Sequence, residues 1–404
     1  KPISTLPGDP ERKAGKLSPL DSIRQSLLTL HAGFLAIDPA TGYILAWVGG
    51  IDHKKFQYDH VTSKRQVGST FKPIVYAAAL EKGIKPCEFF SNEKRIYEKY
   101  DNWSPSNSEG SYDGYYSMKG ALVHSVNTVS AELILQTGIP RVIALAKKMG
   151  VDSPIPEVPS IVLGAANISL KEMAFAYSSF INHGRPVKPV GITRIEDKEG
   201  NVLFAHKPSP PGDEVISIET AMTMTHMLKE VVDSGTARSL HSVYHLKTEL
   251  GGKTGTTQNN ADGWFIGFST NIVAGCWVGA ENPSVHFRTT RLGQGAHTAL
   301  PIFARFVQKL ENSPNHKTYT SGTFPLLPAH LVKEFDCPDF SMKNPRLSFI
   351  EKLFMRDAKA DSIRDIKRED RKLKRKEKKS EREKKGIRHG LRKLFGGRKK
   401  KDER

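Results

Sequence analysis

A serine and a lysine three residues apart form the strongest candidate for chemistry in this chain. They lie in the segment Gly68-Ser-Thr-Phe-Lys-Pro73, which runs into an Ala-rich helical stretch, 74–80. Residues at i and i+3 share one helix face, and Ser69 in the first turn lies at the positive end of the helix dipole. If burial or nearby cations lower the pKa of Lys72, its neutral amine can take the hydroxyl proton of Ser69. This spacing is typical of a lysine-activated serine nucleophile, although a helix N-cap beside a solvated lysine gives the same pattern.

A second polar group, Lys253-Thr-Gly-Thr-Thr257, contains the only Lys-Thr-Gly of the sequence. A short polar turn separates it from the apolar run 263–268, and we expect it on an edge strand. Such a strand can present an ammonium, two hydroxyls and a backbone N–H along one line, which suits a substrate carboxylate and an oxyanion. A phosphate-binding loop is excluded, because Lys247 occupies the position where that motif requires glycine.

The third motif, Ser125-Val-Asn127, lies 56 residues after Ser69 and 128 before Lys253. Ser-x-Asn also occurs at 269–271 and 313–315, so the pattern carries weight only through its position between the other two motifs. A second hydroxyl can relay a proton from the lysine of the first motif to a leaving amine, and the amide can hold that lysine and a substrate carbonyl. A polar helix turn is the structural alternative.

The hydrophobic patterns supply the elements that must position these motifs. Apolar runs at 33–38 and 43–47 flank a turn containing glycine, which is a hairpin signal. The other expected elements are helices at 22–30, 69–82, 117–137, 140–149, 169–182, 217–233 and 299–310, and strands at 262–269 and 271–280. Strands at both ends with helices between them predict an α+β fold with one antiparallel sheet flanked by helices.

The net charge of +18 over 404 residues is concentrated at the C-terminus. Residues 351–404 carry 24 Lys+Arg against 11 Asp+Glu, a surplus of +13, which leaves +5 for the first 350 residues. A near-neutral body with a basic tail argues against a nucleic-acid-binding domain with a basic face. The chain starts without Met and has no run of about 18 apolar residues, so we interpret it as the C-terminal piece of a longer protein.

The three cysteines fit no metal-ligand spacing, and we expect no metal site. Cys276 lies in the apolar run 272–278 and is expected to be a small core residue. Cys87 and Cys337 could pair in an oxidising compartment, but spacing alone leaves their connectivity open.

Ser-x-x-Lys, Ser-x-Asn and Lys-Thr-Gly in this order are the motifs of serine β-lactamases and penicillin-binding proteins. Over about residues 20–312, the chain resembles the transpeptidase part of class A penicillin-binding proteins, which are bifunctional peptidoglycan synthases. The segments that carry the resemblance outside the motifs are 32–50, 64–73, 103–107, 234–238 and 252–265. It implies a penicillin-binding/β-lactamase-like fold with a linker at 1–20, the transpeptidase domain at 21–312, an extended linker at 313–345 and a basic helical or disordered tail at 346–404.

The resemblance implies a D,D-transpeptidase in which Ser69 attacks the penultimate D-Ala carbonyl of a stem peptide. D-Ala leaves, and an amine of a neighbouring strand resolves the acyl-enzyme into a cross-link. Lys72 would accept the proton, Ser125 would relay it, and Asn127 would hold both Lys72 and the acyl donor. Lys253 would supply positive potential. No cofactor is implied.

The same resemblance assigns the substrate contacts. The hydroxyls of Thr254 and Thr256 would meet the terminal carboxylate, and Gly255, Thr257 and Trp103 would complete the binding set. The oxyanion hole would be the backbone N–H groups of Ser69 and Thr256. Stem peptides and β-lactams would be the ligands.

The resemblance also implies features of the parent chain. It would carry a glycosyltransferase and an upstream transmembrane helix absent here, anchoring it at the periplasmic, extracytoplasmic face of the bacterial inner membrane. The oligomeric state is not indicated.

Three other enzyme or binding classes share the motifs. A class A β-lactamase deacylates with a Glu and its water, but residues 158–166, where that loop would lie, contain no Glu-x-x-x-Asn. This favours transpeptidation. A D,D-carboxypeptidase and a penicillin sensor without turnover remain open.

The basic tail suggests a separate contact. Ile387, Leu391, Leu394 and Phe395 are spaced as one apolar helix face among basic residues. That pattern suits anionic lipid or an envelope polyanion, whereas a disordered tail without a binding role is the alternative. We do not expect nucleic acid as a partner.

Overall fold

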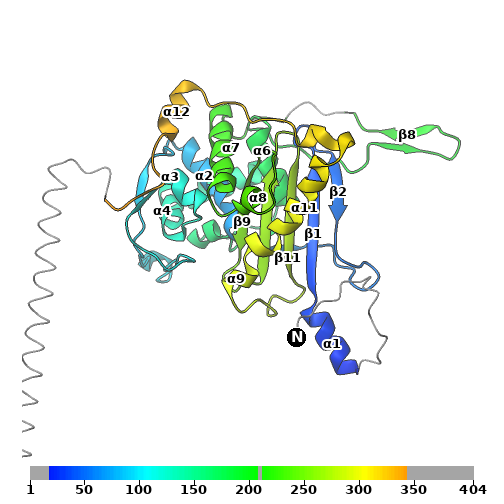
Figure 1. Ribbon diagram of the computed structural model, residues 1–404, viewed down its shortest axis with the longest axis horizontal. Coiled ribbons are helices and arrows are strands. Elements are labelled where there is room, and N and C mark those ends of the chain that lie inside the picture. The colour runs from blue at the N-terminus through cyan, green and yellow to red at the C-terminus, as the bar shows by residue number, and fades with distance from the viewer. Residues whose placement is uncertain (1–17, 208–211, 344–404) are drawn as a thin grey trace, which may run out of the picture. The chain divides into compact units, whose positions relative to one another are not determined.

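Residues 18–207 and 212–343 are described by a computed structural model, in which strands from both ends of the domain combine into one antiparallel sheet (Figure 1). The sheet has the order β2-β1-β11-β10-β9. Its strands are β1 (Leu30–Ile37), β2 (Ile44–Val48), β9 (Gly251–Thr256), β10 (Asp262–Phe268) and β11 (Val273–Ala280). The expected α+β fold is therefore confirmed.

The N-terminal hairpin joins the C-terminal strands through one long pairing. β1 runs antiparallel to β11, from Leu30 opposite Ala280 to Ile37 opposite Val273. β10 then pairs with β9, which leaves β9 and its Lys-Thr-Gly motif at the edge of the sheet, as expected.

Helices cover both faces of the sheet. The described helices are α1 (Pro19–Leu28), α2 (Lys72–Glu81), α3 (Met118–Val123), α4 (Asn127–Thr137), α5 (Ile139–Lys148), α6 (Leu170–Ile181), α7 (Ile218–Asp233), α8 (Ser239–Ser242), α9 (Thr290–Gly293), α10 (Gly295–Thr298), α11 (Leu300–Glu311) and α12 (Ala329–Phe335). Phe265 of β10 packs on Phe303 of α11, with ring centroids 4.8 Å apart. The neighbouring Ile266 points to the other face, where Leu170 of α6 lies against Gly275. Burial on both faces explains the continuous apolar runs of β10 and β11.

Short strands form three smaller sheets that the sequence patterns did not predict. β3 (Lys64–Gln66) pairs with β6 (Asn167–Ser169), and β5 (Tyr115–Ser117) lies between β4 (Phe89–Ser91) and β12 (Phe340–Ser341). β7 (Arg194–Glu196) and β8 (Val202–Ala205) form a projecting hairpin (Figure 1). Strands of two to four residues are too short to display a periodic pattern.

The single helix expected at 117–137 is wrong. The structure breaks it into α3 and α4, and Ser125 in the break has a φ of +57°. A non-glycine residue in the left-handed region is costly unless its surroundings hold it there. The contacts of Ser125 described below supply that support.

The extended linker expected at 313–345 is also wrong over its described part. This part contains a 3-10 helix (Pro314–Tyr319), α12 and β12. Its Pro- and Ser-rich composition favours extended chain, but Phe324 and Leu331 are buried and fix it to the domain. A disulfide joins Cys87 to Cys337, the pairing that spacing left open, and Cys276 is buried as expected.

The other domain boundaries stay predictions. The linker before residue 18 and the tail at 346–404, with its amphipathic pattern, lie outside the described residues. Among the described helices, none alone is long and apolar enough to cross a membrane; α4 and α5 meet the length and composition criteria only as a pair bent by 89°.

Candidate active site

Ser69 lies in a tight turn held against the edge strand of the sheet. Residues Gly68–Phe71 form a 3-10 helix that runs directly into α2, and the Lys72 N–H donates to the Ser69 carbonyl. Gly68 has a φ of +55°, and a Cβ at this position would lie 2.7 Å from the carbonyl oxygen of Thr256 and 2.8 Å from its nitrogen. Only glycine permits this approach, which brings the half-buried Ser69 next to β9.

Lys72 points from the start of α2 into the break between α3 and α4. Its Nζ contacts the Ser125 carbonyl at 2.7 Å, the Asn127 Oδ1 at 2.8 Å and the Ser125 Oγ at 3.2 Å. The left-handed backbone of Ser125 turns both its carbonyl and its hydroxyl toward this lysine. The helix break is therefore what joins the first motif to the second.

Lys253 reaches the same hydroxyl from the sheet. Its Nζ donates to the Ser125 Oγ at 3.0 Å and to the Thr254 carbonyl at 3.1 Å. The Ser125 hydroxyl consequently lies between two lysine amines that come from residues 181 positions apart in the chain. The structure thus brings together Lys72, Ser125, Asn127 and Lys253, four of the five residues expected to be catalytic. The fifth, Ser69, lies three residues before Lys72 in the adjoining 3-10 helix.

Burial sets the electrostatics of this cluster. Lys72 and Lys253 are both completely buried. Burial lowers the pKa of Lys72 well below its ordinary value, and the positive charge of Lys253 lowers it further. Burial lowers the pKa of Lys253 to about 7. A neutral Lys72 amine has a lone pair for a proton, so the arrangement can deprotonate a nearby hydroxyl.

A polar loop supports Asn127 from the side opposite to Lys72. The Asn127 side-chain amide donates to the Ser106 carbonyl at 2.7 Å, and the Asn107 Oδ1 accepts from the backbone N–H groups of Asn127 and Thr128 at 2.9 and 3.2 Å. Asn107 therefore caps the N-terminus of α4. Our site prediction omitted Asn107, although it closes the 103–107 segment that resembles the family.

The threonines of β9 differ in their contacts. Thr254 shares a hydrogen bond of 2.8 Å with the Thr236 hydroxyl, and the Thr256 hydroxyl accepts from the Gly295 N–H at 3.0 Å. Gly255 lies against the nucleophile turn, where a Cβ would approach the Val67 carbonyl oxygen to 2.8 Å. These residues form a row along the edge of β9 beside Ser69.

Thr257 and Trp103 do not join the lysine–serine cluster. Thr257 is buried and accepts from the Asp262 N–H at 3.0 Å, so its hydroxyl serves the turn between β9 and β10. Trp103 is half-buried and packs on Tyr97 with ring centroids 5.6 Å apart, in the loop that leads to Ser106. Their predicted substrate contacts stay predictions.

An ion pair fixes the turn between β9 and β10. Arg65 donates to the Asp262 Oδ1 at 2.8 Å and to the Ala280 carbonyl at 2.8 Å, and Trp277 donates to the same Asp262 oxygen at 3.0 Å. Arg65 lies four residues before Ser69, so the pair ties the nucleophile segment to the sheet. Both residues lie in segments that carry the family resemblance, and that resemblance is the sequence signal that could have identified them.

Residues 158–166 lie behind the nucleophile turn. They form a 3-10 helix (Pro159–Leu163) followed by Gly164, whose added Cβ would collide with Gly68. The Gly68 N–H donates to the Gly164 carbonyl at 3.4 Å. This segment supplies backbone contacts rather than a carboxylate beside Ser69.

Comparison with known proteins agrees with this geometry. The family model "Penicillin binding protein transpeptidase domain" matches residues 32–304. Penicillin-binding protein 1A of Neisseria flavescens is 32% identical over 287 residues, covering 69% of this chain and 35% of that protein. The corresponding protein of Aquifex aeolicus is 30% identical over 331 residues, covering 81% and 44%. This chain therefore spans well under half of these relatives' length.

Solved structures agree as well. Penicillin-binding protein 1A from Haemophilus influenzae has a TM-score of 0.67 and 27% identity, covering 74% of this chain and 49% of that chain. PonA1 from Mycobacterium tuberculosis has a TM-score of 0.63 and 25% identity, covering 74% and 81%. With the family model matching most of its length and the two lysines meeting at Ser125, the chain belongs to the penicillin-binding protein transpeptidase family.

Proposed function

We propose that this chain is a D,D-transpeptidase domain that cross-links peptidoglycan stem peptides through an acyl-enzyme on Ser69. The observation that carries the proposal is the Ser125 hydroxyl between the buried amines of Lys72 and Lys253, at 3.2 and 3.0 Å. This arrangement lies beside a serine at the start of a helix, in a member of the transpeptidase family.

Acylation uses the lowered pKa of Lys72. The neutral amine takes the Ser69 proton while the serine oxygen bonds to the penultimate D-Ala carbonyl carbon. The negative charge on the carbonyl oxygen is stabilised by the backbone N–H groups of Ser69 and Thr256. When the peptide bond breaks, the proton passes from Lys72 through the Ser125 hydroxyl to the departing D-Ala amine.

Deacylation reverses these proton transfers with a different nucleophile. An amine of a second stem peptide attacks the acyl carbon, gives its proton to the same relay, and restores the free Ser69. Attack by water instead would make the domain a D,D-carboxypeptidase, and no attack at all would make it a sensor. Residues 158–166 contain no Glu to activate water, which argues against a class A β-lactamase.

Binding of the donor peptide follows from the row on β9. The hydroxyls of Thr254 and Thr256, with the potential of Lys253, suit a terminal carboxylate, and Asn127 suits the donor amide. A structure of PonA1 contains penicillin V. We extend this to β-lactams as acylating ligands of Ser69.

The parent protein is proposed to do more than this chain. Since the chain spans about a third of its Neisseria relatives, glycosyl transfer and a membrane anchor upstream are assigned to the missing part, with the active site on the periplasmic side.

Labelling with a fluorescent penicillin tests the proposal. We expect the intact protein to be labelled and the Ser69→Ala variant to remain unlabelled. Ser91→Ala is the matched control, because Ser91 and Lys94 repeat the Ser-x-x-Lys spacing on a strand and loop without a helix. Labelling that survives Ser69→Ala would refute the assignment.

A second assay identifies the acceptor. With a stem peptide ending in D-Ala-D-Ala and an added acceptor amine, we expect D-Ala release together with an amide product. D-Ala release without that product would identify a carboxypeptidase, and labelling without release a sensor.

A further inference from the structure

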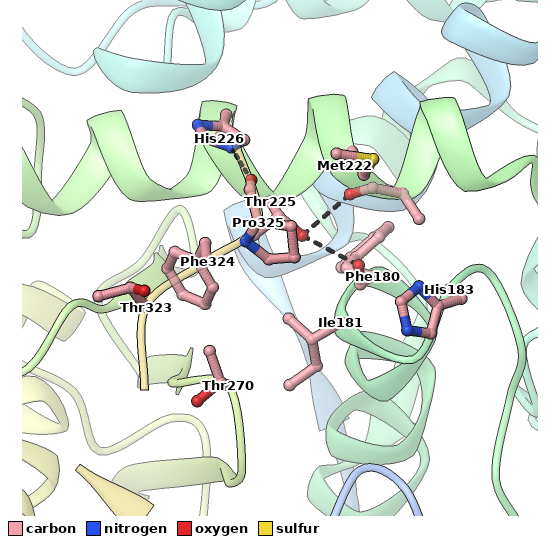
Figure 2. A pocket seen from close by; sticks show the side chains of 11 residues that line it. Phe180, Ile181, His183, Met222, Thr225, His226, Thr270, Thr323, Phe324 and Pro325 are labelled. Atoms are coloured by element: carbon pink, nitrogen blue, oxygen red, sulfur yellow. Dashed lines mark hydrogen bonds between the residues drawn. The ribbon is translucent and has the colours of Figure 1, made fainter. Parts of the chain in front are cut away.

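Residues 323–343, here called the strap, lie beyond the transpeptidase match, which ends at residue 304. At the start of the strap, the Phe324 N–H donates to Glu249 at 2.7 Å and the buried Phe324 ring packs on Phe268 of β10 at 5.7 Å, before the strap crosses α7. The Pro325 carbonyl contacts the His226 ring at 2.9 Å (Figure 2). This crossing fixes the direction of the strap toward α3.

A pocket of about 220 Å³ remains between the strap, α6 and α7. The Thr225 hydroxyl, which lines the pocket, already donates to the backbone carbonyl oxygens of Phe180 and Ala221, at 2.9 Å each. The pocket lies at the crossing, whereas the contacts of the strap with α3 lie at its far end.

The far end of the strap is fixed in three ways. The disulfide joins Cys337 to Cys87 in the domain, and β12 adds to the edge of β5 with Phe340 opposite Tyr116. The Ser117 N–H, just before α3, donates to the Asp339 carbonyl at 2.9 Å.

Asp339 then lies along α3. Its carboxylate contacts the His124 Nε2 at 3.2 Å and the Lys119 Nζ at 3.8 Å. Lys119 also contacts Glu230 of α7 at 3.3 Å. A Cβ on Gly120 would collide with the backbone of Asp339, so the strap rests directly on this helix.

α3 leads into the catalytic turn. It has six residues, and its C-cap is His124, the residue that immediately precedes Ser125. A helix of this length has little stability of its own, and the left-handed backbone of Ser125 has to be maintained by neighbouring contacts. Asp339 contacts His124, the last residue before that turn.

We propose that the strap positions Ser125, with Asp339 as the positioning residue and the Cys87–Cys337 disulfide as the bond that keeps it in place. The inference rests on the proposed function, because it assumes that Ser125 relays protons during acylation. Without the strap, α3 and the Ser125 turn shift away from Lys72 and Lys253. The chemical step then slows, while the binding surface on β9 stays intact.

Acylation kinetics separate these effects. For a chromogenic β-lactam, we expect Cys337→Ser to lower the acylation rate constant about tenfold, with the dissociation constant of the preceding complex unchanged. Reduction of the folded wild type should produce the same loss, and the reductant should not affect Cys337→Ser. Asp339→Asn should lower the rate constant by a smaller factor, and Asp339→Glu should restore part of it.

Glu334→Gln is the matched control, because Glu334 lies on the strap but pairs with the exposed Lys85 at 2.8 Å, away from α3. Its acylation should equal that of the wild type. If reduced wild type and Asp339→Asn acylate as fast as the unmodified protein, or if they lose only thermal stability, the strap does not position Ser125. A wild type that is not acylated at all would refute the proposed function instead.

Discussion

Two pairs of buried nitrogen bases lie in this domain, and they differ in what surrounds them. In the lysine pair, Lys72 and Lys253, each Nζ contacts two or more oxygens within 3.2 Å. In the histidine pair, His31 and His60, no ring nitrogen has a hydrogen-bond partner among the described residues. Burial lowers the pKa in both pairs. Only the lysines share a hydroxyl through which a proton can move.

The histidine pair has a structural role, because its rings pack against aromatic side chains. The His60 ring stacks on Trp277 at 4.7 Å, and the His31 ring meets Phe56 edge-on at 4.6 Å. Arg65, whose guanidinium lies 4.9 Å from the Trp277 ring centre, adds a positive charge nearby that disfavours protonation. A lowered pKa therefore indicates a catalytic base only where the basic nitrogen also contacts oxygens that can carry a proton to or from the substrate.

Removing a base from the lysine pair should have the largest effect. We expect Lys72→Met to lower the rate of acylation by β-lactam on the order of 10³-fold, because general-base assistance is lost. The melting temperature should stay level or rise, since an apolar side chain of similar size replaces a buried amine. Lys82→Met, on an exposed lysine at the end of α2, is the control. Near-normal acylation by Lys72→Met would contradict the lysine's role as base.

Breaking the ion pair between Arg65 and Asp262 should lower the stability of the fold more than the activity. Arg65→Met leaves the buried Asp262 carboxylate without its cation, and we expect a loss of about 3 kcal/mol in unfolding free energy. Denaturant titration measures it. Adding Asp262→Asn should recover part of the loss, and a double variant no more stable than the single one would argue against an unpaired charge as the cause.

The histidine pair should make the fold acid-sensitive. The pKa of His60 is lowered to about 4 in the folded state from an ordinary 6.5. The unfolded chain therefore binds more protons between these values, and stability should fall as pH drops from about 6.5 to 4, on the order of 2 kcal/mol.

His60→Phe keeps the ring on Trp277 and removes this titration, so its unfolding free energy should vary less with pH over that range. His53→Phe, at an exposed position, should retain the wild-type dependence. Identical pH dependence in wild type and His60→Phe would mean that other groups cause the acid sensitivity.

The smallest effect concerns the support of the lysine pair. Asn107→Ala removes the side-chain oxygen that accepts from the first backbone N–H groups of α4, and we expect about 1 kcal/mol of lost stability. A several-fold slower acylation should accompany it, because Asn127 then loses one of its anchors. Asn312→Ala, an exposed cap at the end of α11, tests whether cap loss alone slows the reaction; equal rates for both variants would remove the link to Asn127.

Local sequence determined much of this protein. The helix that follows the nucleophile motif, the N-terminal hairpin and the buried strands β10 and β11 all follow from spacings within a few residues. The helix expected from Ser69 begins at Lys72 instead, because Gly68–Phe71 form a 3-10 helix. Such patterns can be read because helix and strand periodicity place neighbouring side chains on known faces. The order of three short motifs then indicated the family, which the comparisons confirmed.

Tertiary structure determined the features that depend on contacts between distant segments of the chain. The helix break at Ser125 exists because Lys72 and Lys253, from distant segments, hold its carbonyl and hydroxyl. Asn107 caps α4 because the tertiary fold places its loop at the start of that helix. Residues 313–343 are not extended, because a disulfide and buried side chains attach them to the domain. In each case the stabilising contact joins residues far apart in the chain, and its energy is absent from any short window of sequence.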